Sequence, residues 1–373
     1  MNITELRTPA VLVDVARVRT NIARMQAAAA ATGVRLRPHA KTHKSPVIAR
    51  WQLEQGAVGV CCAKVGEAEI FADAGIEDIR LPYPVNPDNA DRIVKLLDRA
   101  RLSIIVDHPM VAKGWSEAMR TAGRTLDVLV KVDVGFHRCG IDPTADDAAA
   151  FVAEVASLPG LRLRGLLSHA GHAYHAGSER DLRAIAADEV RLLKQVAEAA
   201  RRLGVTIDEL SVGATPTARF SVCEKGVTEL RPGNYVYFDR TQIGLGSATL
   251  ADCALTVIAT VVTAHADRVI LDCGSKTLGL DQARGGVGQS GHGLIFQDLD
   301  ANSPDDSLRI ERLSEEHATV RVLNGPTDLE PGDRVRVLPN HSCVVSNLVN
   351  EIVLIEGERV IERLPVAARG RLS

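Results

Sequence analysis

Short apolar runs alternate with amphipathic stretches from about residue 15 to residue 240 of the chain. The apolar runs have the length of buried strands, whereas the stretches between them are rich in Ala, Leu, Glu and Arg, which favour helix. Eight such strands alternating with helices favour a parallel (β/α)8 barrel of TIM type over an open doubly wound sheet. A Rossmann fold is further disfavoured because no GxGxxG sequence follows an early strand. The predicted strands span residues 34–39, 58–63, 79–83, 102–107, 128–133, 163–169, 209–213 and 235–239, and the predicted helices span residues 18–31, 64–74, 90–100, 110–122, 145–158 and 179–203.

The pattern changes after about residue 245, where β-branched runs are separated by turns such as Glu-Pro-Gly-Asp. This pattern predicts a C-terminal all-β domain, which the early apolar run 10–13 is expected to join. We therefore expect residues 1–14 to join the β domain, residues 15–242 to form the barrel and residues 243–373 to form the β domain. The glycine-rich stretch 285–293 follows no strand-to-helix pattern and predicts a flexible loop. The predicted strands of the β domain span residues 254–264, 268–271, 317–323, 334–338, 351–355 and 359–362.

The composition indicates a soluble protein with neither nucleic acid nor a membrane as partner. The 373 residues, 46% of them hydrophobic and 24% charged, can bury a large core. The net charge of −3 gives no reason to expect nucleic acid or an anionic membrane surface as a partner. No uncharged apolar stretch reaches about 18 residues, and the N-terminus lacks a signal-peptide core, so we expect a cytoplasmic protein. The seven cysteines include no CxxC pair, and the six other than Cys343 are predicted to pack in the core, at positions 61, 62, 139, 223, 253 and 273.

The run RLRPHAKTHK at 35–44 carries basic residues at alternate positions. Alternate residues of a strand share one face, so an extended run would crowd these cationic side chains. Crowding of like charges lowers the pKa of a lysine and favours its neutral, nucleophilic form. Lys41, at the end of the first predicted strand, could then form a Schiff base with pyridoxal phosphate or with a carbonyl substrate. Taken alone, this run favours the alternative of a solvated basic edge strand or a phosphate-binding patch.

Polar residues follow several predicted strands at the end where barrel enzymes place their chemistry. Lys41 follows the first strand, Arg138 the fifth, and His169, Tyr174 and His175 the sixth. Each histidine alone is more often structural than catalytic. Their shared position at one barrel mouth nevertheless favours a functional site.

The seventh predicted strand ends in the sequence SVGATPT at 211–217. Gly213 and Thr215 leave backbone amides open to the close approach of an oxyanion, which suits a phosphate group. In isolation, this sequence is about as often a turn that enters a helix.

The β domain contains the sequence PNHSC at 339–343. In an extended segment, His341 and Cys343 share one face and can bind one metal through an imidazole nitrogen and a thiolate, a pair that suits zinc. Two ligands do not complete a metal site. A buried histidine beside a buried cysteine is the default interpretation of these residues alone.

Several motifs occur in one order along the chain: TPA at 8–10, RPHAKTHK at 37–44, GVCCAKVGEA at 59–68, VDVG at 132–135, RCG at 138–140, SVGATPT at 211–217 and PNHSC at 339–343. This ordered set extends over nearly the whole chain and resembles the D-threonine aldolase and D-serine dehydratase family. The resemblance implies a fold-type III pyridoxal phosphate enzyme related to alanine racemase, with an N-terminal barrel and a C-terminal β domain. It also implies a divalent metal (Zn, Mn or Mg) beside the cofactor, and a homodimer.

The same resemblance assigns roles to individual residues. Lys41 resembles the lysine that forms the Schiff base with the cofactor. Gly213 and Thr215 resemble residues of the phosphate loop, and His341 and Cys343 resemble the metal pair. Three more residues lie in or near the stretch that faces the cofactor ring in this family: Arg138, His169 and Tyr174.

Two reactions of a small β-hydroxy-D-amino acid stay open. Removal of the hydroxyl proton gives retro-aldol cleavage to glycine and an aldehyde. Removal of the α-proton by Lys41 and departure of the hydroxyl group instead dehydrate D-serine or 3-hydroxy-D-aspartate to a 2-oxo acid and ammonia. Cys343 resembles the dehydratases, whereas His175 matches the histidine proposed as the hydroxyl base in aldolases. We predict a D-threonine aldolase, with a dehydratase and a non-catalytic pyridoxal phosphate carrier as alternatives.

Overall fold

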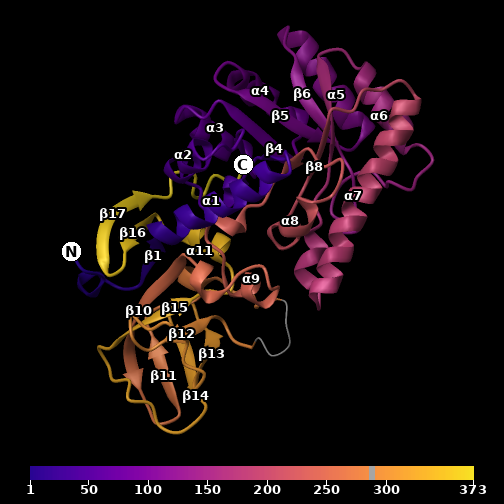
Figure 1. Cartoon of the computed structure of the whole chain (residues 1–373). Helices are drawn as coiled ribbons and strands as arrows, with labels where there is room; N and C mark the ends of the chain where they lie inside the picture. The colour runs from indigo at the N-terminus through magenta and orange to yellow at the C-terminus, as the bar shows by residue number, and fades with distance from the viewer. Residues whose placement is uncertain (285–289) are drawn as a thin grey trace.

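The structure is a computed structural model that describes residues 1–284 and 290–373. Figure 1 shows a helix-rich part from α1 to α8 and, beside it, a β-rich part that contains β1 and the C-terminal strands. The N-terminus lies at the outer edge of the β-rich part, next to β17. Residues 285–289 of the predicted flexible loop lie outside the described residues.

Eight parallel strands form the sheet of the helix-rich part, in the order β2-β9-β8-β7-β6-β5-β4-β3. The two end strands meet, because the Val58 N–H donates to the Leu36 carbonyl at 2.9 Å, and His39 and Cys61 form a parallel bridge. The sheet thus closes on itself, and the predicted (β/α)8 barrel is confirmed. Its strands are β2 (Arg35–Leu36), β3 (Val60–Cys61), β4 (Asp78–Pro84), β5 (Arg101–Val106), β6 (Leu126–Lys131), β7 (Leu161–Leu167), β8 (Glu209–Val212) and β9 (Glu229–Leu230).

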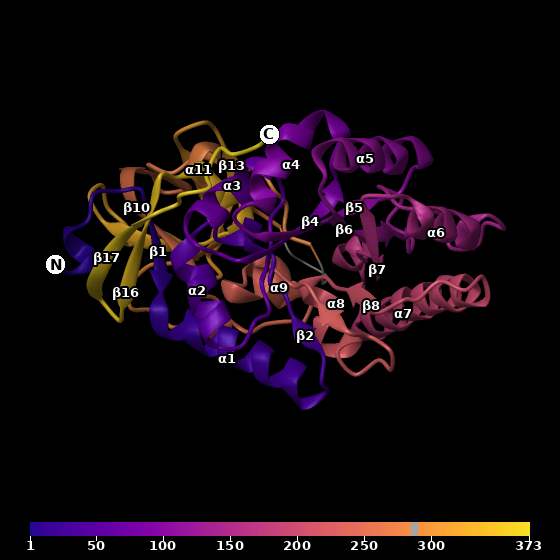
Figure 2. The same cartoon turned by 90° about the horizontal axis from the view of Figure 1, so that it is seen from above.

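Helices cover the outside of this barrel, as the view from above in Figure 2 shows. Local sequence sets their ends. The Asp14 side chain begins α1 by accepting a hydrogen bond from the Arg17 N–H at 3.0 Å. Gly123 ends α5 with a φ of 62°, a left-handed conformation that glycine adopts without strain. The helices are α1 (Val15–Ala31), α2 (Pro46–Glu54), α3 (Val65–Asp73), α4 (Ala90–Leu97), α5 (Pro109–Ala122), α6 (Ala148–Ser157), α7 (Glu179–Arg202) and α8 (Thr215–Ser221), of which α2 and α8 were not predicted.

The β-rich part is a mostly antiparallel sheet in the order β13-β14-β11-β10-β1-β16-β17, with β15 paired to β10 and β12. Strand β1 lies between β10 and β16 and is parallel to β16. The predicted all-β domain is therefore confirmed, while the proposed boundaries at residues 14 and 242 stay predictions. The elements are β1 (Ala10–Asp14), β10 (Leu255–Ala264), β11 (Arg268–Leu271), β12 (Leu294–Phe296), β13 (Leu308–Leu313), β14 (Ala318–Val322), β15 (Arg334–Leu338), β16 (Glu351–Glu356) and β17 (Arg359–Pro365), with helices α9 (Arg240–Gly244), α10 (Ser275–Leu278) and α11 (Ser342–Leu348).

The eighth barrel strand is β9, so the prediction of a strand at 235–239 is wrong. Residues Asn234–Val236 form the 3-10 helix η5, and Phe238 has a φ of 50°, which is incompatible with a strand. This run is apolar because it packs in one cluster with side chains of α1 and of the β domain. The true strand is short and contains Glu229, a charged residue that the sequence pattern alone assigns to the surface.

The basic run ends its extended course at residue 39. The backbone then forms the 3-10 helix η2 (Ala40–Thr42), which carries Lys41. Arg37, rather than joining a row of unpaired cations, forms an ion pair with Glu229 at 2.8 Å. The expectation of a continuous cationic strand face is therefore wrong, although Lys41 does follow the first barrel strand.

Four of the six cysteines predicted to lie in the core are buried. The prediction is wrong for Cys139, which is half-buried, and for Cys223, which is exposed. Both lie outside the strands, Cys139 in the loop after β6 and Cys223 just after α8. Their apolar neighbours in the sequence therefore do not bury them.

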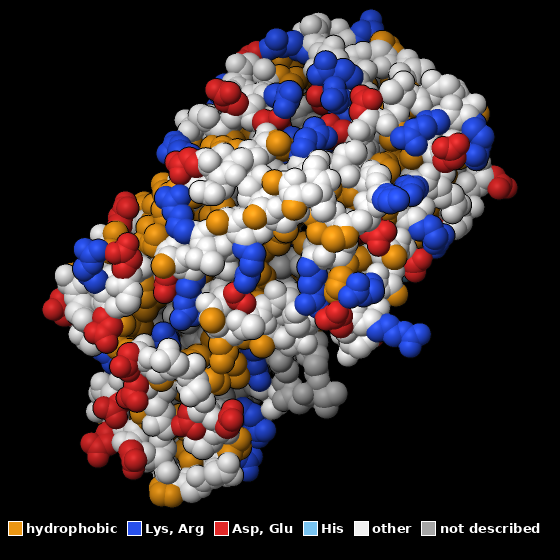
Figure 3. All heavy atoms as spheres, viewed as in Figure 1, with side chains coloured by type: hydrophobic (Ala, Val, Ile, Leu, Met, Phe, Trp, Pro, Cys, Tyr) orange, Lys and Arg blue, Asp and Glu red, His pale blue; other side chains and the backbone are white. Residues whose placement is uncertain are grey.

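The surface carries charges of both signs. On the face shown in Figure 3, Lys and Arg side chains are interspersed with Asp and Glu over the barrel part. None of the described helices is long and apolar enough to cross a membrane.

A network of buried ion pairs lies inside the barrel. Glu229 accepts hydrogen bonds from Arg37 at 2.8 Å, from Arg80, and from Ser211 at 2.6 Å. Arg80 also donates to Glu209 at 2.8 Å. Burial alone would raise the pKa of Glu229, but the charges of Arg80 and Arg37 lower it to about 2. The network therefore holds a carboxylate ionised inside the barrel.

Glu229→Ala should lower the free energy of unfolding by about 3–5 kcal/mol, because it leaves two buried guanidinium groups without their shared partner. Urea titration at neutral pH measures this loss. The matched control is Glu351→Ala, which breaks an exposed pair with Arg363 and should cost at most about 1 kcal/mol. Because the folded-state pKa of Glu229 is depressed, its contribution should disappear as the pH falls from 4.5 towards about 2. Equal losses for the two variants would contradict this interpretation.

Candidate active site

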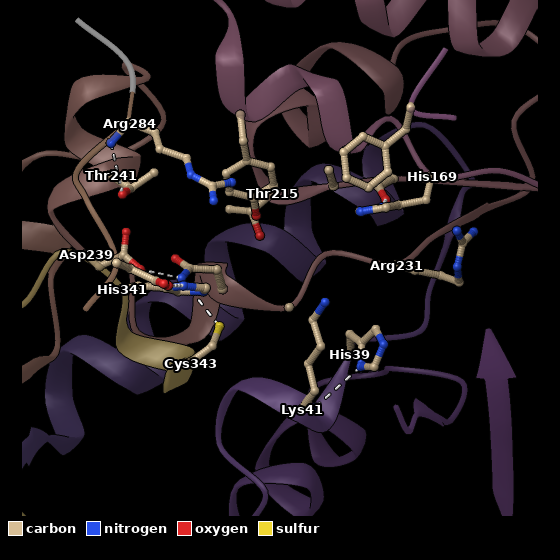
Figure 4. A pocket seen from close by; sticks show the side chains of 18 of the residues that line it. His39, Lys41, His169, Thr215, Arg231, Asp239, Thr241, Arg284, His341 and Cys343 are labelled. Carbon is tan, nitrogen blue, oxygen red and sulfur yellow. Dashed lines mark hydrogen bonds and ion pairs between the residues drawn. The ribbon is translucent and has the colours of Figure 1, made fainter. Parts of the chain in front are cut away.

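A cavity of about 260 Å³ opens where the carboxyl ends of the barrel strands meet the β domain. Figure 4 shows that side chains enter it from both parts of the chain. The structure brings eight of the nine predicted site residues to this cavity: Lys41, Arg138, His169, Tyr174, Gly213, Thr215, His341 and Cys343.

Lys41 extends from η2 into the cavity, and Figure 4 shows its amine end between Cys343 on one side and His39 on the other. Burial lowers the pKa of His39 far below its usual value, and the charges of Lys41 and Arg231 lower it further. His39 is therefore a neutral imidazole next to the lysine. An exposed amine at the mouth of a barrel is available for covalent attachment of a carbonyl compound.

A backbone cradle lies at the junction of β8 and α8. Gly213 has a φ of 131°, and a Cβ added there would lie 3.0 Å from the backbone nitrogen of Arg231. The residue before α8, Ala214, offers no side-chain acceptor to the first amides of the helix. Thr215 begins the helix and lines the cavity. Pro216 has no N–H, so the donors at the beginning of α8 are the amides of Thr215 and Thr217, which together with the Thr215 hydroxyl group suit a phosphate.

Arg231 and His169 form the floor of the cavity on the barrel side. Arg231 donates from Nη1 to the Ser211 hydroxyl at 2.6 Å and from Nη2 to the Ser168 carbonyl. His169 Nδ1 is 2.9 Å from the Gly213 carbonyl, so Nδ1 carries the proton. Burial lowers the pKa of His169 far below its usual value, and nearby cationic side chains lower it further. Both groups are thus held in fixed orientations, one cationic and one neutral.

Tyr174 and Arg138 occupy two loops at the mouth. Tyr174 lies on the 3-10 helix η4 (Gly171–His175) after β7, and burial raises the pKa of its hydroxyl, which stays protonated. Arg138 lies in the loop after β6, with its guanidinium carbon 5.0 Å from the centre of the Phe136 ring. Arg138 thus places a positive charge at the barrel side of the mouth.

His341 and Cys343 lie together on the β-domain side of the cavity (Figure 4). His341 precedes α11 and Cys343 lies in its first turn, so the predicted extended segment is wrong, although both side chains reach the cavity. The Nδ1 of His341 is hydrogen-bonded to Asp281, which leaves Nε2 for a ligand. The Cys343 sulfur lies 3.2 Å from the Thr42 hydroxyl.

These two side chains stabilise each other's charged forms. Burial alone would lower the pKa of His341, but the Cys343 thiolate and Asp281 raise it to about 11. Burial alone would raise the pKa of Cys343, but the charge of His341 lowers it. A divalent cation can replace the proton that such a pair holds. Among the described residues no group of three or more His, Cys, Asp or Glu side chains is placed to hold a metal, so a metal here would keep open positions.

Two family models match the chain in succession. The model of the alanine racemase N-terminal domain matches residues 13–241, which is more than half of the chain. The model of the putative serine dehydratase domain matches residues 254–355. The chain belongs to the alanine-racemase-like family that includes D-threonine aldolases and D-serine dehydratases.

Individual relatives in this family carry different lyase names. D-threo-3-hydroxyaspartate dehydratase of Delftia sp. (strain HT23) is 35% identical over 91% of this chain and 91% of that protein. D-threonine aldolase of Arthrobacter sp. is 34% identical over 97% of this chain and 93% of that protein. A solved structure of D-threo-3-hydroxyaspartate dehydratase, a cysteine-to-alanine mutant in the metal-free form, has a TM-score of 0.91 and 31% identity, covering 98% of this chain and 99% of that chain. The chain is thus related to both aldolases and dehydratases.

The family uses pyridoxal phosphate, and the cavity fits this group. Lys41 supplies an amine for the aldehyde, and the Gly213–Thr215 cradle supplies donors for the phosphate. The neutral imidazole of His169 and the guanidinium of Arg231 lie on the barrel side, where an aromatic ring and its nitrogen can be contacted.

The remaining predicted residue, His175, is exposed and does not line the cavity. It lies at the end of η4, one residue beyond Tyr174. Its assignment as the hydroxyl base of an aldolase stays a prediction without geometric support. His172, the other histidine of this loop with a half-buried side chain, does not line the cavity either.

Several residues of the cavity are not predicted by the sequence patterns. Arg231 follows β9, whereas the patterns predict the eighth strand at 235–239, so they do not place Arg231 at the end of a barrel strand. Asp281 and Arg284 come from an irregular segment of the β domain after α10, where no periodicity indicates a site. A search for charged residues in that segment could have identified them as candidates.

Proposed function

We propose that this chain is a pyridoxal phosphate- and divalent-metal-dependent lyase that dehydrates β-hydroxy-D-amino acids to 2-oxo acids and ammonia. The observation that carries the proposal is the placement of Lys41 and the His341–Cys343 pair in one cavity. An amine that can move the α-proton and a metal pair that can act on the β-hydroxyl group thereby face the same small volume.

The residues on the barrel side would hold the cofactor. Lys41 would bind its aldehyde carbon, Gly213 and Thr215 its phosphate, and His169 and Arg231 its ring. Bound pyridoxal phosphate supplies an acceptor for the electron pair that is released at the substrate Cα. The Lys41 amine, which reaches the same cavity, would act as the base that takes the proton from the substrate Cα.

The residues on the β-domain side would hold the metal. His341 would bind through Nε2 and Cys343 through its sulfur, while Asp281 fixes the imidazole orientation. A bound divalent ion supplies a Lewis acid for the β-hydroxyl group. The metal-free cysteine mutant of the related dehydratase supports a metal role for a cysteine in this family.

The position of the candidate bases favours dehydration over retro-aldol cleavage. Dehydration takes the proton from Cα, where Lys41 is available, and the hydroxyl group leaves. Retro-aldol cleavage needs a base at the hydroxyl proton, and the residue predicted for this task, His175, is exposed outside the cavity. D-threonine aldolase is the second candidate, supported by the Arthrobacter relative. The homodimer that the resemblance implies stays a prediction.

Product analysis tests this proposal directly. The holoenzyme, loaded with pyridoxal phosphate and a divalent metal, should release a 2-oxo acid and ammonia from D-serine or from a 3-substituted D-serine, and should leave the L-isomers unchanged. Glycine and acetaldehyde from D-threonine, formed much faster than ammonia from D-serine, would overturn it in favour of the aldolase.

His175→Ala separates the two candidates further. A general base contributes about 10²- to 10⁴-fold in rate, so an aldolase that uses His175 should lose at least about 10²-fold in D-threonine cleavage while keeping bound cofactor and metal. Because His175 is exposed outside the cavity, we expect the variant to retain the dehydration rate within about threefold. A large loss of ammonia release in His175→Ala would contradict the position of His175 outside the cavity.

A further inference from the structure

Arg284 is a cationic side chain of the cavity to which neither the fold nor the proposed reaction gives a role. Among the described residues that line the cavity, the other Lys and Arg side chains have an assigned place. Lys41 would carry the cofactor, Arg231 is bound to Ser211 and Ser168, and Arg138 lies at the barrel side of the mouth. Arg284 instead reaches the cavity from the β domain.

The surroundings of Arg284 leave its guanidinium without a fixed partner. Its backbone N–H is 3.4 Å from the Thr241 hydroxyl, which anchors the residue to the cavity wall. Within the described part of the chain, its side chain forms no ion pair and no hydrogen bond. The nearest acid along the chain, Asp281, is instead hydrogen-bonded to His341. The guanidinium is exposed and Figure 4 shows it directed into the cavity, on the same side as His341.

We propose that Arg284 binds a second carboxylate of the substrate, the one attached to Cβ, and that it thereby selects 3-hydroxy-D-aspartate over D-serine and D-threonine. The inference rests on the proposed function, in which a metal held by His341 and Cys343 would bind the β-hydroxyl group. Substituents on Cβ would then lie near His341, on the side from which Arg284 enters the cavity. A guanidinium binds a carboxylate through two parallel hydrogen bonds, which neither the hydrogen of D-serine nor the methyl group of D-threonine can form.

The other anions of the bound state have candidate partners on the barrel side of the cavity. The backbone cradle at Gly213 and Thr215 would bind the cofactor phosphate. Arg138, at the barrel side of the mouth, would bind the α-carboxylate. Figure 4 shows, however, that the Arg284 guanidinium extends towards Thr215, so a contact with the phosphate is the main competing role. The experiment therefore has to separate the two anions.

Selectivity of turnover gives the first measurement. The ratio of kcat/KM for D-threo-3-hydroxyaspartate to kcat/KM for D-serine is compared in wild type, Arg284→Gln and Arg284→Lys. A hydrogen-bonded ion pair contributes at least about tenfold to binding, so Arg284→Gln should lower the ratio at least about tenfold, mainly through KM. Arg284→Lys should restore part of the ratio, because it keeps the charge but not the planar fork. The matched control is Arg363→Gln, which removes an exposed guanidinium of β17 that does not line the cavity.

Ligand binding gives a measurement that does not depend on turnover. D-Aspartate carries the second carboxylate but no β-hydroxyl group, and D-alanine carries neither. Calorimetry with the holoenzyme should show that Arg284→Gln weakens D-aspartate at least about tenfold more than it weakens D-alanine. Two results would overturn the proposal. Equal weakening of D-aspartate and D-alanine would assign Arg284 to the α-carboxylate. A raised Kd for pyridoxal phosphate, with an unchanged ratio of the Kd values of D-aspartate and D-alanine, would assign Arg284 to the phosphate. If the wild type turns over no β-hydroxy-D-amino acid, the proposed function fails, and the D-aspartate measurement still decides the role of Arg284.

Discussion

Lys41→Ala should abolish turnover of every β-hydroxy-D-amino acid and the covalent attachment of pyridoxal phosphate. Among the described residues that line the cavity, Lys41 is the one lysine, so no neighbouring amine can replace it. The same side chain is proposed to move the α-proton. We therefore expect a loss of about 10⁴-fold or more, at the upper end of what a single general base contributes.

Borohydride reduction followed by peptide mass mapping checks the covalent attachment. In the wild type the modified peptide should contain Lys41, and in Lys41→Ala no modified peptide should appear. The matched control is Lys64→Ala, whose amine lies 5.0 Å from the centre of the Tyr83 ring and does not line the cavity. This control should retain attachment and turnover. Modification of Lys44 or Lys64 in the wild type would show that the assignment of Lys41 is wrong.

The barrel was predictable because its strands are buried on both faces and read as apolar runs. Strand β9 is the exception, because it contains the buried and charged residue Glu229. A buried carboxylate is acceptable only because Arg37 and Arg80 reach it from distant parts of the chain. Those partners cannot be inferred from local sequence, so local sequence favours the apolar run that follows as the eighth strand. That run is buried against the β domain, which local periodicity cannot distinguish from burial inside a barrel.

The site was predictable as far as its residues follow strands or belong to the ordered set of motifs. Lys41 and Gly213 follow barrel strands, and His341 and Cys343 belong to the PNHSC motif, which gains its weight from the other motifs. Asp281 and Arg284 belong to an irregular segment whose position against the barrel depends on the packing of the two domains. His175 shows the opposite limit, since it follows a barrel strand but is exposed, while Tyr174 beside it in η4 lines the cavity. The order of residues in a short 3-10 helix thus decides which side chain reaches the cavity.

Removal of the divalent metal should lower turnover by at least about 10²-fold while pyridoxal phosphate stays attached to Lys41. The metal is proposed to act on the β-hydroxyl group, whereas the cofactor is held by the barrel side of the cavity. His341→Ala and Cys343→Ala should reproduce the chelated state, because each leaves one protein ligand. Dialysis against EDTA removes the metal. Metal analysis then measures the metal content, product release measures turnover, and the absorption of the bound cofactor measures its attachment to Lys41. Full turnover in a preparation verified as metal-free would show that the reaction does not require a metal.

Asp281→Asn distinguishes a metal pair from a pair that is only structural. Asp281 is hydrogen-bonded to His341 and does not itself need to bind the ion. Loss of such a partner typically lowers metal affinity by about 10- to 100-fold, so excess metal should restore turnover to Asp281→Asn but not to His341→Ala. The control for thiol chemistry is Cys223→Ala, an exposed cysteine outside the cavity, which should retain metal and turnover. Excess metal could also fail to rescue Asp281→Asn although the metal content of the variant matched that of the wild type. Asp281 would then have a direct role in the reaction, and the proposal that it only orients the His341 imidazole would be wrong.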